Sequence, residues 1–193
     1  MFPVLAIGLG LALGWASGGS VQRLAESSWR WGWLAILLFV AQGVSRGRLL
    51  GLAGWPQLGI VVWVCSSLCL VLVLLLEWRV PGMIIAGIGT LANVEVVLLN
   101  GGMPVGLPPL GTYEALHVLS GAQRVFYEPV AEHTLGSALG DVLPLGAAGN
   151  WTMLSVGDVL LMVGVCIWVV GAMTVNRPRM GSEQSVAELS NLG

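Results

Sequence analysis

Long apolar runs separated by short polar stretches dominate this chain. The runs occupy residues 1–15, 31–44, 58–76, 82–99 and 156–175. A helix rises about 1.5 Å per residue, so roughly 20 residues cross a hydrocarbon core of about 30 Å. The third run is long enough by itself. The first and second are short, and we expect them to extend toward Gly19 and to start near Trp29, respectively. The pattern predicts an all-α polytopic membrane helix bundle with about five transmembrane helices.

The fourth and fifth runs are separated by a much longer polar segment, residues 100–155. We interpret it as one long extracytoplasmic loop within a membrane domain spanning residues 1–175. Residues 111–124 within it fit an amphipathic helix lying on the membrane surface. Residues 176–193 form a polar C-terminal tail. The sequence therefore predicts one membrane domain and a tail.

Composition agrees with a membrane location, since 56% of the residues are hydrophobic and only 9% are charged. The net charge of −2 argues against nucleic acid as a partner, because such binding needs a basic face. The lipid bilayer and another membrane protein are the partners to expect.

The distribution of arginines predicts the orientation. With the N-terminus outside, the cytoplasmic segments hold Arg23, Arg30, Arg79, Arg177 and Arg179. The outer segments hold Arg46, Arg48 and Arg124. This excess fits the positive-inside rule. We predict a multi-pass protein of the cell membrane with a cytoplasmic C-terminus.

Two polar residues, Asn93 and Glu95, lie inside the fourth apolar run. Asn93 shares a helix face with Gly82, Ala86 and Gly89, a small-residue pattern that lets membrane helices pack closely. Asn93 therefore suits either an interhelical hydrogen bond or a contact to a substrate or ion. Glu95 lies about one turn from the helix end, where its carboxyl group can reach the interface or contact a ligand.

Further candidates flank the long loop. Asn100 ends the fourth run and is followed by two glycines and Pro104, which predicts a sharp turn. Ser155 and Asp158 open the fifth run in the S-x-x-D pattern of a capping box. The candidate polar site consists of Asn93, Glu95, Asn100, His133, Asp141 and Asp158.

No motif among these residues specifies a reaction. Asp141, Asp158 and Glu95 would bind a hard cation if they met near one interface. His133 is not part of a zinc-binding spacing. We therefore expect neither a metal nor another cofactor.

Several motifs in this order resemble an uncharacterised bacterial membrane-protein family, the domain of unknown function 5317. The similarity covers a glycine-rich first helix and first loop, Asn93, Asn100–Val105, His133–Thr134, Leu139–Pro144 and Ser155–Val159. Glu95 departs from it, since an apolar residue is expected there. The resemblance implies a membrane protein and points to the two Asp and two Asn positions, but it implies no activity.

Three functions are compatible with these observations. The first is a non-enzymatic accessory or structural membrane component. The second is a small-solute or ion transporter that uses Asn93, Glu95, Asn100 and Asp158, with a polar cavity between the fourth and fifth helices. The third is a membrane-embedded enzyme acting on lipid, with Asp141 or His133 as general acid or base. The absence of a catalytic constellation favours the first.

Overall fold

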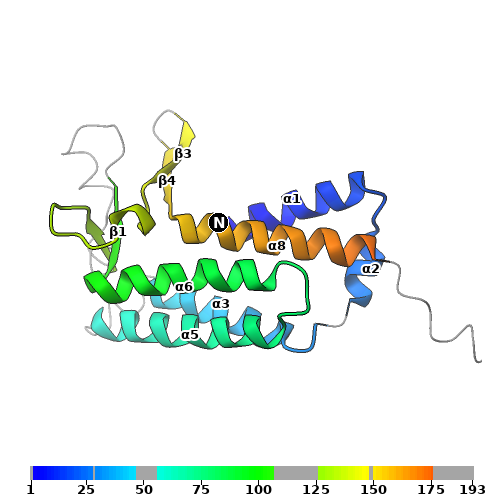
Figure 1. Ribbon diagram of the computed structural model, residues 1–193, viewed down its shortest axis with the longest axis horizontal. Helices are drawn as coiled ribbons and strands as arrows, with labels where there is room; N and C mark the ends of the chain where they lie inside the picture. The colour runs from blue at the N-terminus through cyan, green and yellow to red at the C-terminus, as the bar shows by residue number, and fades with distance from the viewer. Residues whose placement is uncertain (1, 28, 47–55, 107–125, 148–149, 176–193) are drawn as a thin grey trace, which may run out of the picture.

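The computed structural model describes residues 2–27, 29–46, 56–106, 126–147 and 150–175. Helices dominate these segments, and each predicted apolar run coincides with one. They are α1 (Phe2–Ala16), α3 (Gly32–Arg46), α5 (Pro56–Leu76), α6 (Met83–Asn100) and α8 (Val156–Thr174). Their axes lie roughly alongside one another, with short strands at one end and α2 (Val21–Glu26) at the other (Figure 1).

The first two helices are shorter than expected. α1 ends at Ala16 because Gly18 adopts a positive φ of 76° and the next amide, from Gly19, donates to the Gly14 carbonyl at 2.8 Å. This is the pattern of a Schellman motif. α3 begins at Gly32, after a turn in which the Gly32 amide donates to the carbonyl of Trp29. The expected extensions to Gly19 and Trp29 are therefore wrong, and α2, which was not predicted, follows α1 directly.

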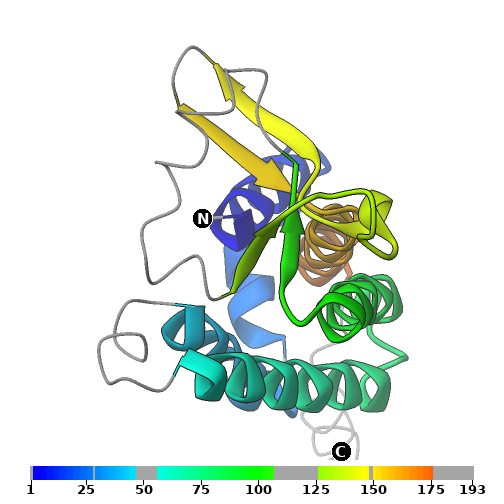
Figure 2. The ribbon, with the colours of Figure 1, turned by 90° about the vertical axis from the view of Figure 1, so that its left-hand side faces the viewer.

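The five long helices alternate in direction as they follow one another along the chain, whereas α1 and α8, which also pack together, are parallel. α6 and α8 are antiparallel, since Gly82 lies against Gly164 and Gly89 lies against Gly157. α3 packs beside α5, and α5 packs beside α6, whereas α1 packs on α8 (Figure 2).

The α6–α8 contact depends on glycines spaced seven residues apart. A Cβ atom added at Gly89 would collide with the Gly157 carbonyl oxygen, and one added at Gly164 would lie 2.6 Å from the Ala86 backbone nitrogen. Seven residues are nearly two turns, so each pair of glycines shares one helix face. Small residues let the two backbones approach closely, which is how helices gain packing energy in lipid. The predicted packing face of α6 is thus confirmed.

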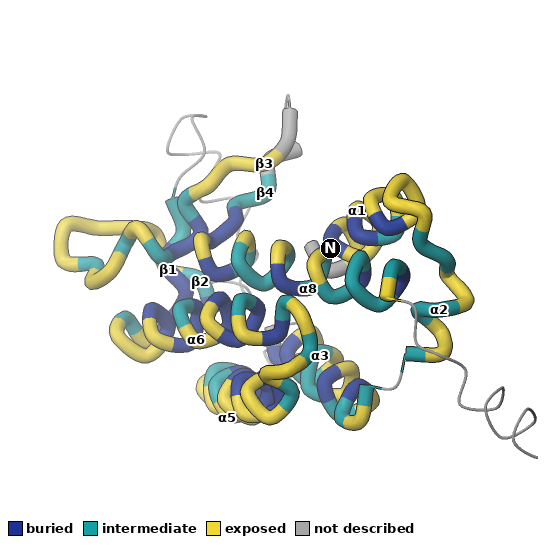
Figure 3. The backbone as a smooth tube through the Cα atoms, turned by 45° about the vertical axis from the view of Figure 1, so that its right-hand side comes forward, coloured by how far each residue is buried: buried dark blue, intermediate teal, exposed yellow. Residues whose placement is uncertain are grey.

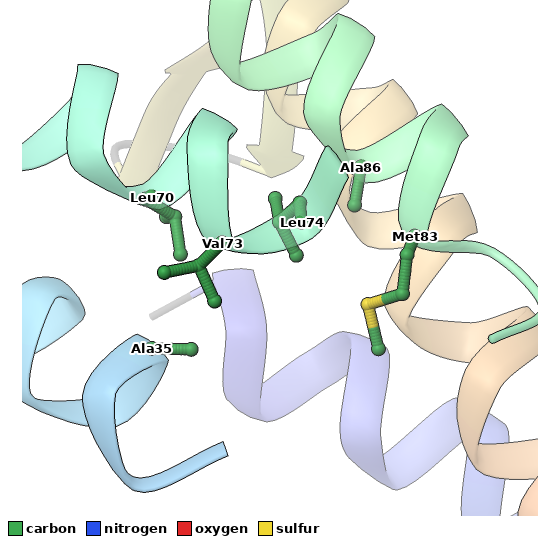
Figure 4. Packing of buried hydrophobic residues seen from close by; sticks show 6 residues of the cluster. All are labelled: Ala35, Leu70, Val73, Leu74, Met83 and Ala86. Carbon is green, nitrogen blue, oxygen red and sulfur yellow. The ribbon is translucent and has the colours of Figure 1, made fainter. Parts of the chain in front are cut away.

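Two groups of buried apolar side chains stabilise the bundle. One joins α3, α5 and α6 and contains Ala35, Leu70, Val73, Leu74, Met83 and Ala86 (Figure 4). The other lies at the strand end of α6, where Trp63 of α5 packs edge-on against Phe126 with ring centroids 5.1 Å apart. Val96 and Val97 belong to this second group and are fully buried. The loop is therefore packed onto the end of α6.

The long loop contains β-structure, so the prediction of an all-α fold is wrong for this segment. β1 (Met103–Val105) pairs in parallel with β2 (Tyr127–Pro129), and β3 (Leu143–Ala147) pairs with β4 (Asn150–Leu154) in an antiparallel hairpin. A short 3₁₀ helix, η2 (Ser137–Leu139), lies between them. Strands of three to five residues carry almost no periodic signal, and only backbone pairing defines them. The predicted amphipathic helix at 111–124 lies outside the described residues.

Within the described residues, three helical segments are long and apolar enough to cross a membrane: Gln57–Leu76, Met83–Asn100 and Val156–Thr174. The apolar segments of α1 and α3, Val4–Ala16 and Gly32–Ser45, are shorter. Exposed residues, yellow in Figure 3, lie on the outer faces of the helices, and many of them are large apolar residues, as expected for surfaces that contact lipid. These features support a helical membrane protein.

Candidate functional site

The polar residues of the fourth and fifth apolar runs meet between α6 and α8. The Asn93 side-chain Nδ2 donates to Oδ1 of Asp158 at 2.9 Å. The Ser155 hydroxyl donates to Oδ1 of Asn93 at 2.8 Å. Ser155 is fully buried and Asn93 is 8% exposed. The side-chain amide of Asn93 in α6 is thus hydrogen-bonded to both Ser155 and Asp158 at the start of α8.

The beginning of α8 holds these partners in place. The Ser155 hydroxyl accepts from the Asp158 backbone amide at 2.8 Å, and Oδ2 of Asp158 faces the Ser155 amide at 3.5 Å. The predicted capping box is therefore confirmed. The carboxylate also complements the positive N-terminal end of the helix. The cap fixes the side chains of Ser155 and Asp158 in the positions from which both form hydrogen bonds to Asn93 of α6.

Gly157 is the residue that sequence reasoning missed in this cluster. A Cβ atom at this position would overlap the Asn93 side-chain amide. Only glycine leaves room for Asn93 to reach past the first turn of α8. The seven-residue spacing of Gly157 from Gly164, matching that of Gly82 from Gly89, was the available signal.

The chemistry open to this cluster is limited. A serine nucleophile needs a base to take its proton, but the Ser155 proton is directed at the oxygen of a neutral amide. Asp158 accepts hydrogen bonds from Asn93 and from its own helix cap. Donors and acceptors are largely matched within the cluster, which suits a structural clamp between two helices.

Asn100 makes a second polar contact, away from the first. Its Nδ2 donates to the carbonyls of Val96 and Leu135 at 2.8 and 2.9 Å, and its Oδ1 accepts from the Leu135 amide at 2.9 Å. This pair of bonds to one residue resembles strand pairing. The Gly101 φ of 73° confirms the predicted sharp turn directly after it. Asn100 therefore fastens the long loop to the end of α6.

Asp141 and His133 both lie in the loop but differ in exposure. Asp141 is 7% exposed, and its backbone joins β1, since its amide donates to the Pro104 carbonyl and its carbonyl accepts from the Gly106 amide. His133 is exposed, in a turn where the Ala131 amide donates to the Thr134 hydroxyl at 2.8 Å. The structure describes no bond between these two side chains.

Glu95 lies apart from the cluster on the exposed side of α6. The hypothesis that Asp141, Asp158 and Glu95 converge on a cation is not supported. Across the described residues, no group of three or more His, Cys, Asp or Glu side chains is arranged to hold a metal ion. Of the six predicted site residues, Asn93 and Asp158 are joined directly, whereas Glu95 and His133 are exposed and Asn100 and Asp141 organise the loop.

Comparison with known proteins gives a family and no activity. No curated protein and no solved structure matches this chain. The model of one family matches residues 26–170 and therefore covers all six predicted site residues. That match extends over most of the chain and agrees with the resemblance inferred from its motifs. The chain belongs to the family of unknown function DUF5317.

Proposed function

We propose that this protein is a non-enzymatic accessory component of a membrane complex, which binds a helix of another membrane protein on the outer face of α6. The observation that carries the proposal is the exposed carboxyl group of Glu95 within an apolar helix surface. The partner helix would present an arginine or lysine to this group.

Glu95 interrupts a continuous apolar surface. Five exposed residues of α6 are spaced alternately four and three positions apart in the sequence. This spacing places them on one side of the helix. We name this side the outer stripe of α6, and it consists of Ile84, Ile88, Leu91, Glu95 and Leu98. The four apolar members are between 45% and 61% exposed. A surface of this kind contacts either lipid or another helix.

The depth of Glu95 makes plain lipid an unfavourable neighbour. At about 1.5 Å per residue, the 18 residues of α6 span about 27 Å, slightly less than a hydrocarbon core of about 30 Å. Glu95 is then roughly 7.5 Å inside the end marked by Asn100. Within the described part of the chain, nothing forms a hydrogen bond or ion pair with its carboxylate. A cation from a partner helix would offset this cost, as ionisable groups in membranes usually require.

The buried polar cluster supports a non-enzymatic role. Asn93, Ser155 and Asp158 bond to one another and to the cap of α8. Transport through this region would require α6 and α8 to separate where Gly89 contacts Gly157. Lipid chemistry at Asp141 would require a route to a buried side chain, and among the described residues no hydrogen bond or ion pair joins it to the exposed His133. Both alternatives therefore have less support than the accessory role.

We further propose five membrane crossings in the cell membrane, with the N-terminus outside and the C-terminus in the cytoplasm. The alternating directions of α3, α5, α6 and α8 support this arrangement. α1 runs in the same direction as α8, as Gly10 meets Val169 and Gly14 meets Met173. In this orientation Glu95 lies toward the extracytoplasmic surface.

The test is photo-crosslinking in native membranes. A photoreactive amino acid replaces Leu91 or Leu98 in the outer stripe, and a control replaces Leu72, a 59% exposed residue of α5. The expected result is a protein adduct from both stripe positions and not from Leu72. Glu95→Gln should weaken the adduct and Glu95→Arg should abolish it.

Charge exchange then decides whether the adduct reflects docking on Glu95. In the partner, the basic residue at the crosslinked site is replaced with glutamate. This partner variant should again form the adduct with the Glu95→Arg variant, because the two charges have been exchanged. Adducts that are unaffected by both Glu95 variants would contradict the proposal, as would adducts to lipid alone. A crosslink to a second copy of this chain would replace the proposed hetero-complex by a homodimer.

A further inference from the structure

A cavity of about 440 Å³ opens at the end of the bundle opposite the strands. It lies between α2, the turn that joins α5 to α6, and the last turn of α8. Its walls combine two arginines, Arg23 and Arg79, with two tryptophans, Trp29 and Trp168. None of these residues belongs to the polar cluster or to the outer stripe of α6, so the cavity is a separate feature.

Arg23 is held in the cavity wall by the end of α8. Its Nη1 donates to the carbonyls of Met173 and Thr174 at 3.1 and 3.4 Å. These carbonyls carry the partial negative charge of a helix C-terminus, which the guanidinium offsets. Both bonds use the same one of the two terminal nitrogens. Arg23 therefore positions a cation in the wall and retains N–H groups for another acceptor.

Arg79 supplies a second cation from the α5–α6 turn. It is exposed, and its guanidinium carbon lies 5.2 Å from the centroid of the Trp78 ring. Glu26 also lines the cavity, and its carboxylate accepts from the Gln22 side chain at 3.1 Å. Two guanidinium groups against one carboxylate leave the walls with a net positive charge. A small anion is the ligand that this charge favours.

The tryptophans give the cavity an apolar side. The rings of Trp29 and Trp168 are in contact, with centroids 5.1 Å apart. Tryptophan prefers the boundary between lipid and water, where one part of the ring is apolar and the N–H is polar. Ser20 and Ser27 also line the cavity and add to its polar side. A ligand with an anionic head and an apolar body would match both sides.

We infer that this cavity binds a phosphate-bearing anion through Arg23 and Arg79. Guanidinium groups are suited to phosphate because their planar donors form paired hydrogen bonds to two oxygens. The phosphate could belong to a phospholipid headgroup of the adjoining leaflet or to a soluble phosphate compound. Competition with soluble phosphate compounds separates these sources.

The full-length chain is placed in nanodiscs of a phosphate-free galactolipid. Phosphatidylglycerol is added as a minor component, and its retention is measured by native mass spectrometry. The unmodified protein should retain it. Arg79→Gln should weaken retention about tenfold, the effect of losing one charge-assisted contact. Arg79→Lys should have an intermediate effect, because it keeps the charge and loses the planar donors.

Arg30→Gln is the matched control. Arg30 is an exposed arginine that stacks on Trp31 and does not line the cavity. The Arg30→Gln variant should retain phosphatidylglycerol as the unmodified protein does. Equal losses in Arg30→Gln and Arg79→Gln would indicate diffuse surface charge and overturn the inference. Thermal unfolding without added phosphate checks that Arg79→Gln is folded.

Competition identifies the source of the phosphate. Glycerol 3-phosphate or inorganic phosphate that displaces the lipid, or that raises the unfolding temperature by itself, would indicate a soluble compound. Retention of phosphatidylglycerol that is unaffected by either anion would indicate the headgroup. Failure of all three probes to bind the unmodified protein would refute the site.

Discussion

Asn93 of α6 and Asp158 of α8 are joined by a hydrogen bond of 2.9 Å, although 65 residues separate them in the chain. The amide can make this bond because Gly157 has no side chain in its path. The same amide accepts from Ser155, so one residue of α6 contacts both members of the α8 cap. This relationship fixes the relative position of the two helices and leads to the first prediction.

Replacing Asn93 with alanine should destabilise the protein by about 1–3 kcal/mol, because the buried Ser155 hydroxyl and the half-buried Asp158 carboxylate lose their partner. Asn93→Asp should be worse, since it places two carboxylates side by side. The exchange Asn93→Asp with Asp158→Asn should recover most of the loss by restoring one amide and one carboxylate. Thermal unfolding in detergent measures each variant. An exchange variant no more stable than Asn93→Asp would refute the direct bond.

Gly89→Ala and Gly157→Ala should each destabilise the α6–α8 pair by roughly 1–3 kcal/mol, because the added methyl group meets backbone or the Asn93 amide. Gly8 in α1 and Gly43 in α3 are matched helical controls, since a Cβ atom there meets nothing within 4 Å. Their alanine variants should be neutral or slightly more stable. Unfolding in detergent compares the four variants, and equal effects at all four positions would contradict the close packing.

Asn100→Ala should loosen the loop without unfolding the bundle. The variant loses the two bonds to Leu135 and the bond to the Val96 carbonyl. Hydrogen exchange should accelerate in residues 131–139 and stay unchanged in α5. The exposed His133→Ala variant serves as the control. Unchanged exchange in the loop would show that Asn100 does not fasten it.

Glu95→Leu should help α6 insert into a membrane. Insertion scales assign roughly 2.5–3.5 kcal/mol to a charged residue at the helix centre, and the gain here should be smaller because Glu95 is off centre. The assay measures insertion of α6 in a carrier protein. The matched variant Leu91→Ile, one turn away on the same stripe, should insert like the parent. A decrease in insertion for Glu95→Leu would contradict a membrane-embedded position.

Hydropathy and local motifs were sufficient to predict several features of this protein. The five apolar runs predicted the five main helices, because a helix in lipid needs a long uninterrupted apolar segment. The S-x-x-D pattern gave the α8 cap, because capping depends on residues three apart. The face of Gly82, Ala86, Gly89 and Asn93 gave the packing side of α6. Each of these depends on residues close together in the sequence.

Only the tertiary structure decided which polar groups meet. Asn93 pairs with Asp158, Asn100 pairs with Leu135, and Glu95 faces outward, yet all three belong to one helix end. The short strands of the loop and the cavity lined by Arg23 and Arg79 likewise combine segments distant in the chain. Local sequence determines the helices and their caps, whereas these contacts depend on how the helices pack, which hydropathy alone does not specify.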